Sequence, residues 1–172
     1  GLTFTSSNGV DYYNNTSYSF TPQSVNGAGK NSMGNSNLQR MLLQSSNNIT
    51  YNHTWNDKHY LTVTGVWEAT KSTIRNMGIS GSSLQAESVG WWDVKNAVTR
   101  DATNGYSDWA LLSGVGRVIY NYDNRYMLTG TFRADGSSRF TNDKWGYFPS
   151  VAVAWTASNE SFMESTVTLS VI

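Results

Sequence analysis

Alternation of apolar and polar side chains recurs along this chain and predicts β-strands. A strand is predicted over residues 39–55, and its second half alternates cleanly. One face of that half holds Ile49, Tyr51, His53 and Trp55, and the other holds Asn48, Thr50, Asn52 and Thr54. Residues 60–68 repeat the pattern, with Leu61, Val63, Gly65 and Trp67 opposite Tyr60, Thr62, Thr64 and Glu68. The tight turn at 56–58 makes the two segments an antiparallel hairpin.

The same criteria predict about seven strands in all. The others are residues 1–20, 109–122, 126–132, 147–155 and a possible seventh at 167–172. Short turns are expected at 56–58, 123–125 and 157–160, and long loops at 21–38, 75–108 and 134–145. The loop at 75–108 is the longest, with weak helical character over 84–98. Short turns that alternate with long loops are typical of outer-membrane barrels.

A sequence pattern that occurs twice in the chain supports this organisation. Tyr51-Asn52-His53 leads through a turn into a Leu/Thr/Gly segment that starts at Tyr60, and Tyr120-Asn121-Tyr122 leads through a turn into a similar segment that starts at Tyr126. Both predicted hairpins therefore carry tyrosines beside a short polar turn, as expected for aromatic rings at a membrane interface.

Composition narrows the class without deciding it. Charged residues make up 14% of the chain, against about 25% in typical domains. Aromatic residues make up 13%, and Asn, Ser and Thr together about a third. This balance suits strands between lipid and a polar lumen. It equally suits a soluble carbohydrate-binding β-sandwich, which stays as the alternative.

Charge and cysteine content exclude several functions. The formal net charge is zero with no basic run, so nucleic-acid binding has no electrostatic basis. The chain has no cysteine, which excludes disulfides, thiolate metal sites and a cysteine nucleophile. No apolar run approaches the roughly 18 residues of a membrane helix. If the chain meets a bilayer, we expect it to do so with strands.

The most informative stretch is residues 132–149, FRADGSSRFTNDKWGYFP, which lies between two predicted strands. Glycine and short polar residues at its centre favour a turn, and aromatic residues surround the charged ones. The run R-x-D-G-S-S-R-F, followed by W-G-Y-F-P-S and then S-x-E-x-F-M, resembles the SusC/RagA type of TonB-dependent outer-membrane transporters. The residues of the first two segments are Arg133, Asp135, Gly136, Ser137, Ser138, Arg139, Phe140, Trp145, Gly146, Tyr147, Phe148, Pro149 and Ser150, and those of the third are Ser158, Glu160, Phe162 and Met163.

The resemblance implies an all-β fold of antiparallel up-and-down strands that form part of a large transmembrane β-barrel. Such barrels have about 22 strands and a plugged lumen, so we expect residues 1–172 to be a partial barrel without its plug domain and remaining strands. It also implies import of glycans, oligosaccharides or peptides across the outer membrane of Bacteroidetes-like bacteria. The implied partners are a SusD-like lipoprotein, TonB and outer-membrane lipid. For the motif residues it implies a structural role.

No set of residues predicts catalysis, so we do not expect an enzyme or a cofactor. His53 and His59 flank the first short turn, but two histidines without nearby Cys or acidic partners make a poor metal site. Asp135 and Asp143 could imitate the carboxylate pair of a glycosidase, but they lie in one turn-rich segment beside basic residues. A catalytic β-domain is therefore disfavoured.

A group of aromatic residues is the candidate contact for a ligand or a lid. Its members are Trp91, Trp92, Tyr106 and Trp109, in or next to the longest predicted loop. Exposed aromatic rings can stack on sugars or bind a partner. They can also simply anchor the loop to the barrel rim.

The facing of eight residues distinguishes the barrel from the sandwich. They are Ile49, Tyr51, Leu61, Val63, Val118, Tyr120, Val151 and Val153. In a barrel all of them point outward to lipid, whereas in a sandwich they face a second sheet.

Overall fold

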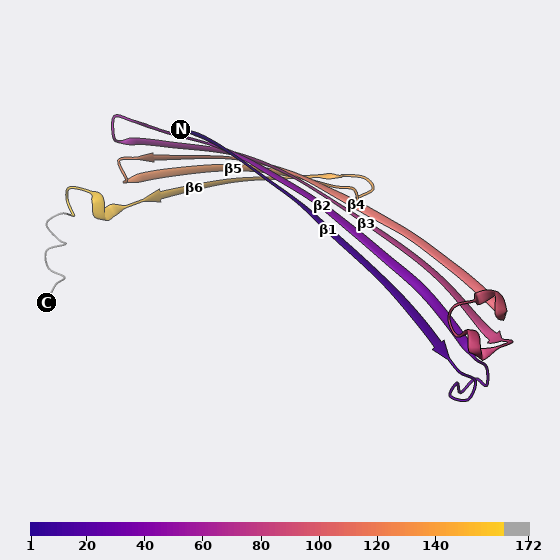
Figure 1. The fold of residues 1–172 in the computed structure, drawn as a ribbon. Helices are drawn as coiled ribbons and strands as arrows, with labels where there is room; N and C mark the ends of the chain where they lie inside the picture. Colours follow the sequence, from indigo (N-terminus) through magenta and orange to yellow (C-terminus); the bar gives the residue numbers. More distant parts are fainter. Residues whose placement is uncertain (164–172) are drawn as a thin grey trace, which may run out of the picture. The chain divides into compact units, whose positions relative to one another are not determined.

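The computed structural model describes residues 1–163 and folds them into one antiparallel sheet with the order β1-β2-β3-β4-β5-β6. Neighbours in the sequence are neighbours in the sheet, as Figure 1 shows. The strands are β1 (Leu2–Thr21), β2 (Ser32–Trp55), β3 (His59–Leu84), β4 (Ala97–Tyr122), β5 (Tyr126–Ser137) and β6 (Trp145–Trp155). Three single 3₁₀ turns complete the described part: η1 (Glu87–Val89), η2 (Val94–Asn96) and η3 (Ala157–Asn159). Within it, no helix is both long enough and apolar enough to cross a membrane.

The predicted all-β, up-and-down arrangement is confirmed, but several boundaries were wrong. The segment expected to be irregular from 75 to 108 is mostly strand, because β3 continues to Leu84 and β4 begins at Ala97. Its helical character reduces to η1 and η2. The first long loop ends before Ser32, and the predicted tip at 134–145 narrows because β5 extends to Ser137. The possible strand at 167–172 lies outside the described residues.

The chain divides into two compact units. The first contains Gly1–Asn8, Gln44–Thr70 and the chain from Ala110 onward, and the second contains Gly9–Leu43 and Lys71–Trp109. The short turns after β2, β4 and β6 belong to the first unit, and the segments 22–31 and 85–96 belong to the second.

Two tight turns of the same conformation join β2 to β3 and β4 to β5. Asn56 and Asp57 have φ of 51° and 52°, and Asp123 and Asn124 both have φ of 52°. Asn and Asp tolerate this left-handed region better than other non-glycine residues, because their short side chains can hydrogen-bond locally. The second turn is closed by the Arg125 N–H, which donates to the Tyr122 carbonyl at 2.9 Å. The pattern that occurs twice in the sequence therefore corresponds to a structural repeat.

Strand register gives the first unit one apolar face. Residues paired across an antiparallel sheet point to the same side. Tyr120 pairs with Leu128, which pairs with Val153, and Val118 pairs with Gly130, which pairs with Val151. The adjacent residues Arg117, Thr131 and Ser150 form a second paired row, on the opposite polar face.

Contacts between β2 and β3 extend the same division. Thr62 donates to Asn52 at 2.7 Å, and Ser46 donates to Glu68 at 3.2 Å, so these polar side chains share a face. A Cβ on Gly65 would lie 3.2 Å from Ile49, on the other face. The alternation of each strand then places Tyr51, Leu61 and Val63 with Ile49. The rings of Trp55 and His59 also contact Tyr120.

The apolar face of the first unit has no cover in the described part of the chain. Val151 and Val153 are 75% and 77% exposed. The buried hydrophobic residues among positions 1–163 are only Met33, Leu84 and Ala97, all in the second unit. The strands form one sheet rather than two packed sheets, so a β-sandwich core is not present in the described residues.

The left-handed turn predicts a position-specific effect at Asn56. Asn56→Val should lower the free energy of unfolding of the full-length protein by about 1–2 kcal/mol, because a β-branched side chain is strained at positive φ. Asn56→Gly should cost nothing. Urea unfolding, followed by tryptophan fluorescence, measures the difference. Thr54→Val, which puts the same side chain on extended backbone, is the control, and equal losses in the two valine variants would contradict the prediction.

Candidate functional site

The motif that carries the resemblance forms the β5–β6 hairpin in the first unit. Its charged pair lies on the polar face, where Arg133 Nε donates to Asp135 Oδ2 at 2.7 Å. The same guanidinium reaches the Ser113 hydroxyl of β4 at 3.5 Å. Asp135 is the sheet partner of Ser113, so the ion pair spans two neighbouring strands. It therefore links β5 to β4 on this face.

The two motif glycines provide room for aromatic rings. Gly136 pairs with Trp145, and a Cβ on Gly136 would come within 3.0 Å of the indole. A Cβ on Gly146 would come within 3.0 Å of the Phe148 ring. Side chains at either position would displace the ring. These contacts between rings and backbone account for glycine at both motif positions.

The two motif serines close the tip of the hairpin. The Ser137 N–H donates to the Lys144 carbonyl at 2.9 Å, and the Ser137 hydroxyl accepts from the Arg139 N–H at 3.3 Å. Ser138 exchanges two hydrogen bonds with Ala110 of β4, at 2.9 Å through its N–H and at 2.8 Å through its hydroxyl. The tip is therefore attached to β4 as well as to its own strands.

The motif aromatics lie on both faces of the hairpin. Phe132 and Tyr147 stack with ring centroids 6.1 Å apart. Phe148 pairs with Arg133 and so belongs to the polar face. Phe140 is exposed at the tip, and Pro149 is the sheet partner of Phe132.

Glu160, from the last part of the motif, joins the ends of β5 and β6 just after η3. Its carboxylate accepts from the Tyr126 hydroxyl at 2.7 Å and from the Trp155 indole at 3.1 Å. The Arg125 guanidinium lies 3.5 Å from Glu160 Oε2, and the Glu160 side chain is only 13% exposed. The Tyr126 and Trp155 hydrogen bonds, together with the Arg125 charge, hold the pKa of Glu160 below its ordinary value. This contact fixes the turn side of the hairpin.

The two candidate histidines lie in a row of aromatic rings in the first unit, beside the turn that joins β2 to β3. His53 stacks on Trp55 at 5.5 Å, and Trp55 stacks on His59 at 5.2 Å. His59 Nδ1 shares a hydrogen bond of 2.6 Å with the Tyr120 hydroxyl. No cluster of three metal-ligating side chains occurs within residues 1–163. The two histidines therefore lie among stacked aromatic rings.

In the second unit, a buried polar contact holds the segment 85–96 in place. The amide of Asn31 is buried and donates to the Leu84 carbonyl and to Glu87 Oε1, both at 3.1 Å. The same Glu87 oxygen accepts from the Gln23 N–H at 2.7 Å. Val89 and Val94 pack against the small core around Met33. The segment is therefore anchored at several points.

This anchored segment presents Trp91 and Trp92. Tyr18 of β1 lies 6.4 Å from both indoles, and the two indoles lie 5.8 Å apart. Asn35 donates to the Trp91 carbonyl at 3.0 Å. Trp92 nevertheless remains 78% exposed. Trp91 anchors the segment, whereas the Trp92 ring is accessible to a ligand or partner.

Tyr106, expected to belong with these tryptophans, makes a different contact. It lies on β4 under the guanidinium of Arg75, 5.9 Å from the ring centroid. Trp109, the fourth candidate, is three residues further along β4. Sequence reasoning missed Tyr18, because a tyrosine in a long polar strand carries no signal of the loop that contacts it.

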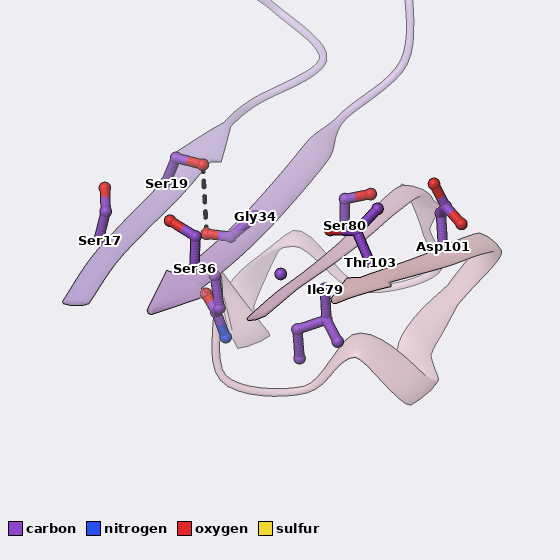
Figure 2. Close-up of a pocket in the computed structure, with 10 residues that line it drawn as sticks. Ser17, Ser19, Gly34, Ser36, Ile79, Ser80, Asp101 and Thr103 are labelled. Atoms are coloured by element: carbon purple, nitrogen blue, oxygen red, sulfur yellow. Dashed lines mark hydrogen bonds between the residues drawn. The ribbon is translucent and has the colours of Figure 1, made fainter. Parts of the chain in front are cut away.

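A groove of about 240 Å³ lies on one face of the second unit. Figure 2 shows the hydroxyls of Ser17, Ser19, Ser36, Ser80 and Thr103 around it, together with the carboxylate of Asp101. Ser19 donates to the Gly34 carbonyl at 3.2 Å. We call this groove of about 240 Å³ the hydroxyl groove. Four strands contribute to it, so no local motif in the sequence could have identified it.

The chemistry of the hydroxyl groove is that of hydrogen bonding. Its side chains offer donors and acceptors, one carboxylate and no basic group. An unactivated serine is a weak nucleophile without a neighbouring base, and no histidine or lysine lines the groove. The groove can hold a neutral polar solute, and nothing in its lining points to a reaction.

Comparisons with known proteins agree with the motif. The chain is 34% identical over 176 residues to the TonB-dependent receptor P39 of Formosa agariphila, covering 96% of the chain and 16% of that receptor. It is 48% identical over 61 residues to the TonB-dependent receptor SusC of Bacteroides thetaiotaomicron, covering 35% of the chain and 6% of SusC. No family model matches the sequence. The chain thus spans about a sixth of the first relative.

The fold also matches a solved structure. A chain in the structure of the RagAB peptide transporter superposes with a TM-score of 0.83 and 22% identity, covering 95% of the present chain and 19% of its own length. The same assembly in a closed-closed state gives a TM-score of 0.82. At this identity the likeness concerns the fold alone, and it agrees with the expected part of a larger barrel.

The Glu160 contact predicts a pH-dependent contribution to stability. Because its folded-state pKa is lowered, the stabilisation is complete above the ordinary glutamate pKa of about 4.3. It is lost as the pH falls through the lower folded-state value. Glu160→Gln should therefore destabilise the full-length protein at pH 7 and do so less at pH 3. Urea unfolding at both pH values measures this.

The control is Asp11→Asn, at an exposed carboxylate on β1. It should leave stability unchanged at both pH values. A Glu160→Gln variant that loses the same stability at pH 3 as at pH 7 would show that the charge of Glu160 does not contribute.

Proposed function

Because this chain belongs to the SusC/RagA type of TonB-dependent transporters, we propose that it forms part of the barrel wall of an outer-membrane nutrient importer. The observation that carries this proposal is the unequal character of the two faces of the first unit. One face carries exposed Leu128, Val151 and Val153. The other carries Arg117, Arg133 and Asp135, which all form hydrogen bonds with other side chains of the protein. Such alternation suits lipid on one side and water on the other.

The proposed cargo is an oligosaccharide. The hydroxyl groove supports this choice, because hydroxyls and a carboxylate match the hydroxyls of a sugar, and its lining offers no cation for a peptide carboxylate. In this proposal the hydroxyl face of the second unit lines the interior of the barrel. A peptide is the second candidate, favoured by the likeness of the fold to a peptide transporter.

The proposed partners are a SusD-like lipoprotein and TonB. The accessible Trp92 ring and its neighbour Tyr18 suit contact with the SusD-like lipoprotein, which would act as a lid, or with the ligand beneath it. Aromatic residues are enriched in protein interfaces and stack on sugars. TonB would engage parts of the receptor other than residues 1–163. The motif hairpin, with its internal contacts, has a structural role in this proposal.

The lipid-facing assignment can be tested at two neighbouring residues of β6. The chain has no native cysteine, so Val153→Cys and Ala152→Cys can each carry a fluorophore in a full-length receptor whose other cysteines are replaced. Brominated lipids should quench the label at 153 strongly and the label at 152 weakly. The reason is that adjacent strand residues point to opposite faces.

Ala152 is the matched control, since it differs from the test site by one position. Equal quenching at both sites, or no quenching at either, would contradict a lipid-exposed face. A label at 153 that is shielded from both lipid and water would instead indicate a second protein sheet over this face.

The cargo can be tested at Asp101. Asp101→Ala should raise the half-saturating concentration for uptake of labelled oligosaccharides about tenfold, since a hydrogen bond to a charged group is worth roughly 1.5–3 kcal/mol. Cells that express the full-length receptor, supplied with panels of labelled oligosaccharides and labelled peptides, provide the measurement. Asp143→Asn at the hairpin tip is the control. Uptake of peptides alone would replace the oligosaccharide with the second candidate.

A further inference from the structure

The second unit carries another groove, of about 320 Å³, whose lining differs from that of the hydroxyl groove. Lys71 and Arg75 of β3 supply two positive charges, and Tyr12, Met41 and Leu43 supply apolar surface. Tyr106 lies beneath the Arg75 guanidinium, and Gln39 and Thr73 complete the lining. The groove therefore combines cations with exposed apolar side chains.

The two cations are available to a ligand. The ion pairs found within residues 1–163 involve Arg125 and Arg133, so neither Lys71 nor Arg75 has a carboxylate within 4.0 Å there. The Arg75 guanidinium lies over the Tyr106 ring, and within residues 1–163 its N–H groups make no hydrogen bond to the protein. Asp108, two residues along β4 from Tyr106, shares its face by alternation but does not line the groove. One acid does not neutralise two cations.

The sequence of β3 places these cations at the end of an apolar stretch. Its odd-numbered residues are apolar or glycine from Leu61 to Ala69 and then become Lys71, Thr73 and Arg75. A barrel strand crosses the hydrocarbon in about 9–11 residues, and the segment from 59 to 69 has that length. If the proposed function holds, Lys71 and Arg75 lie at the level of lipid head groups.

We infer that this groove binds the head-group phosphate of an anionic membrane lipid, whose acyl chains lie along the apolar side chains. Guanidinium and ammonium groups form charge-assisted hydrogen bonds to phosphate oxygens, and basic pockets on membrane proteins hold anionic head groups. Met41 and Leu43 are 40% and 38% exposed, so they offer contact to a hydrocarbon chain. This inference rests on the proposed location of the protein in a membrane.

The test uses the full-length receptor in detergent, titrated with phosphatidylglycerol and analysed by native mass spectrometry. The double variant Lys71→Gln/Arg75→Gln should bind phosphatidylglycerol at least tenfold more weakly, because each basic residue near a lipid surface contributes about 1 kcal/mol. Asp108→Asn should bind it more tightly than wild type. Phosphatidylcholine should be retained weakly by every form of the receptor.

Arg40→Gln is the matched control, since Arg40 also lies over a tyrosine, at 5.7 Å from the Tyr13 ring, but does not line this groove. It should bind phosphatidylglycerol as wild type does. Equal retention by wild type and the double variant, or an equal loss in Arg40→Gln, would overturn the inference. Displacement by millimolar inorganic phosphate would also overturn it, because the site would then be one for the free ion.

Failure of this inference is distinguishable from failure of the proposed function. A receptor recovered in the outer-membrane fraction whose double variant retains lipid normally would remove the lipid site and leave the importer standing. A receptor found outside the membrane fraction would overturn both.

Discussion

Backbone pairing is the constraint on which the rest of this structure depends. In lipid each unpaired N–H or C=O costs several kcal/mol, so a strand there must have neighbours on both sides. Strands β2 to β5 each have two neighbours in the described sheet, whereas β1 and β6 have one. The proposed barrel therefore requires further strands at both edges, consistent with relatives of which the chain covers about a sixth. The same pairing fixes which side chains share a face, and it thereby determines where the apolar surface and each groove lie.

Pairing also explains what could and could not be predicted from the sequence. The turns at Asn56–Asp57 and Asp123–Asn124 were predicted, because Asn and Asp are chemically suited to the left-handed backbone that they adopt. The continuation of β3 to Leu84 and the start of β4 at Ala97 were missed. The end of β3 is rich in Ser and Gly, and the start of β4 is mostly polar, so both segments lack hydrophobic alternation. They are strands because a paired neighbour satisfies their backbone, which is information that no local pattern contains.

The candidate sites divide in the same way. The motif could be identified because its residues are contiguous and make contacts mostly within one hairpin, as Gly136 does with Trp145 and Ser137 does with Lys144. The loop tryptophans were found from their side-chain type alone, but their partner Tyr18 was not. The hydroxyl groove was invisible, because serine and threonine are abundant throughout the chain and only the sheet assembles these particular ones from four strands. Long-range pairing creates such a site.

Register consequently also determines which side chains line the two grooves of the second unit. In β3, the even-numbered residues Gly78 and Ser80 line the hydroxyl groove together with Ile79. The odd-numbered residues Lys71 and Arg75 line the groove of about 320 Å³. A slip of one residue would exchange the two faces. Asn31 opposes such a slip through its hydrogen bond to the Leu84 carbonyl, and so does Gly81, where a Cβ would come within 2.7 Å of the Ala97 methyl. These contacts lie next to segment 85–96, so the anchoring of that segment and the separation of the two grooves depend on the same few residues.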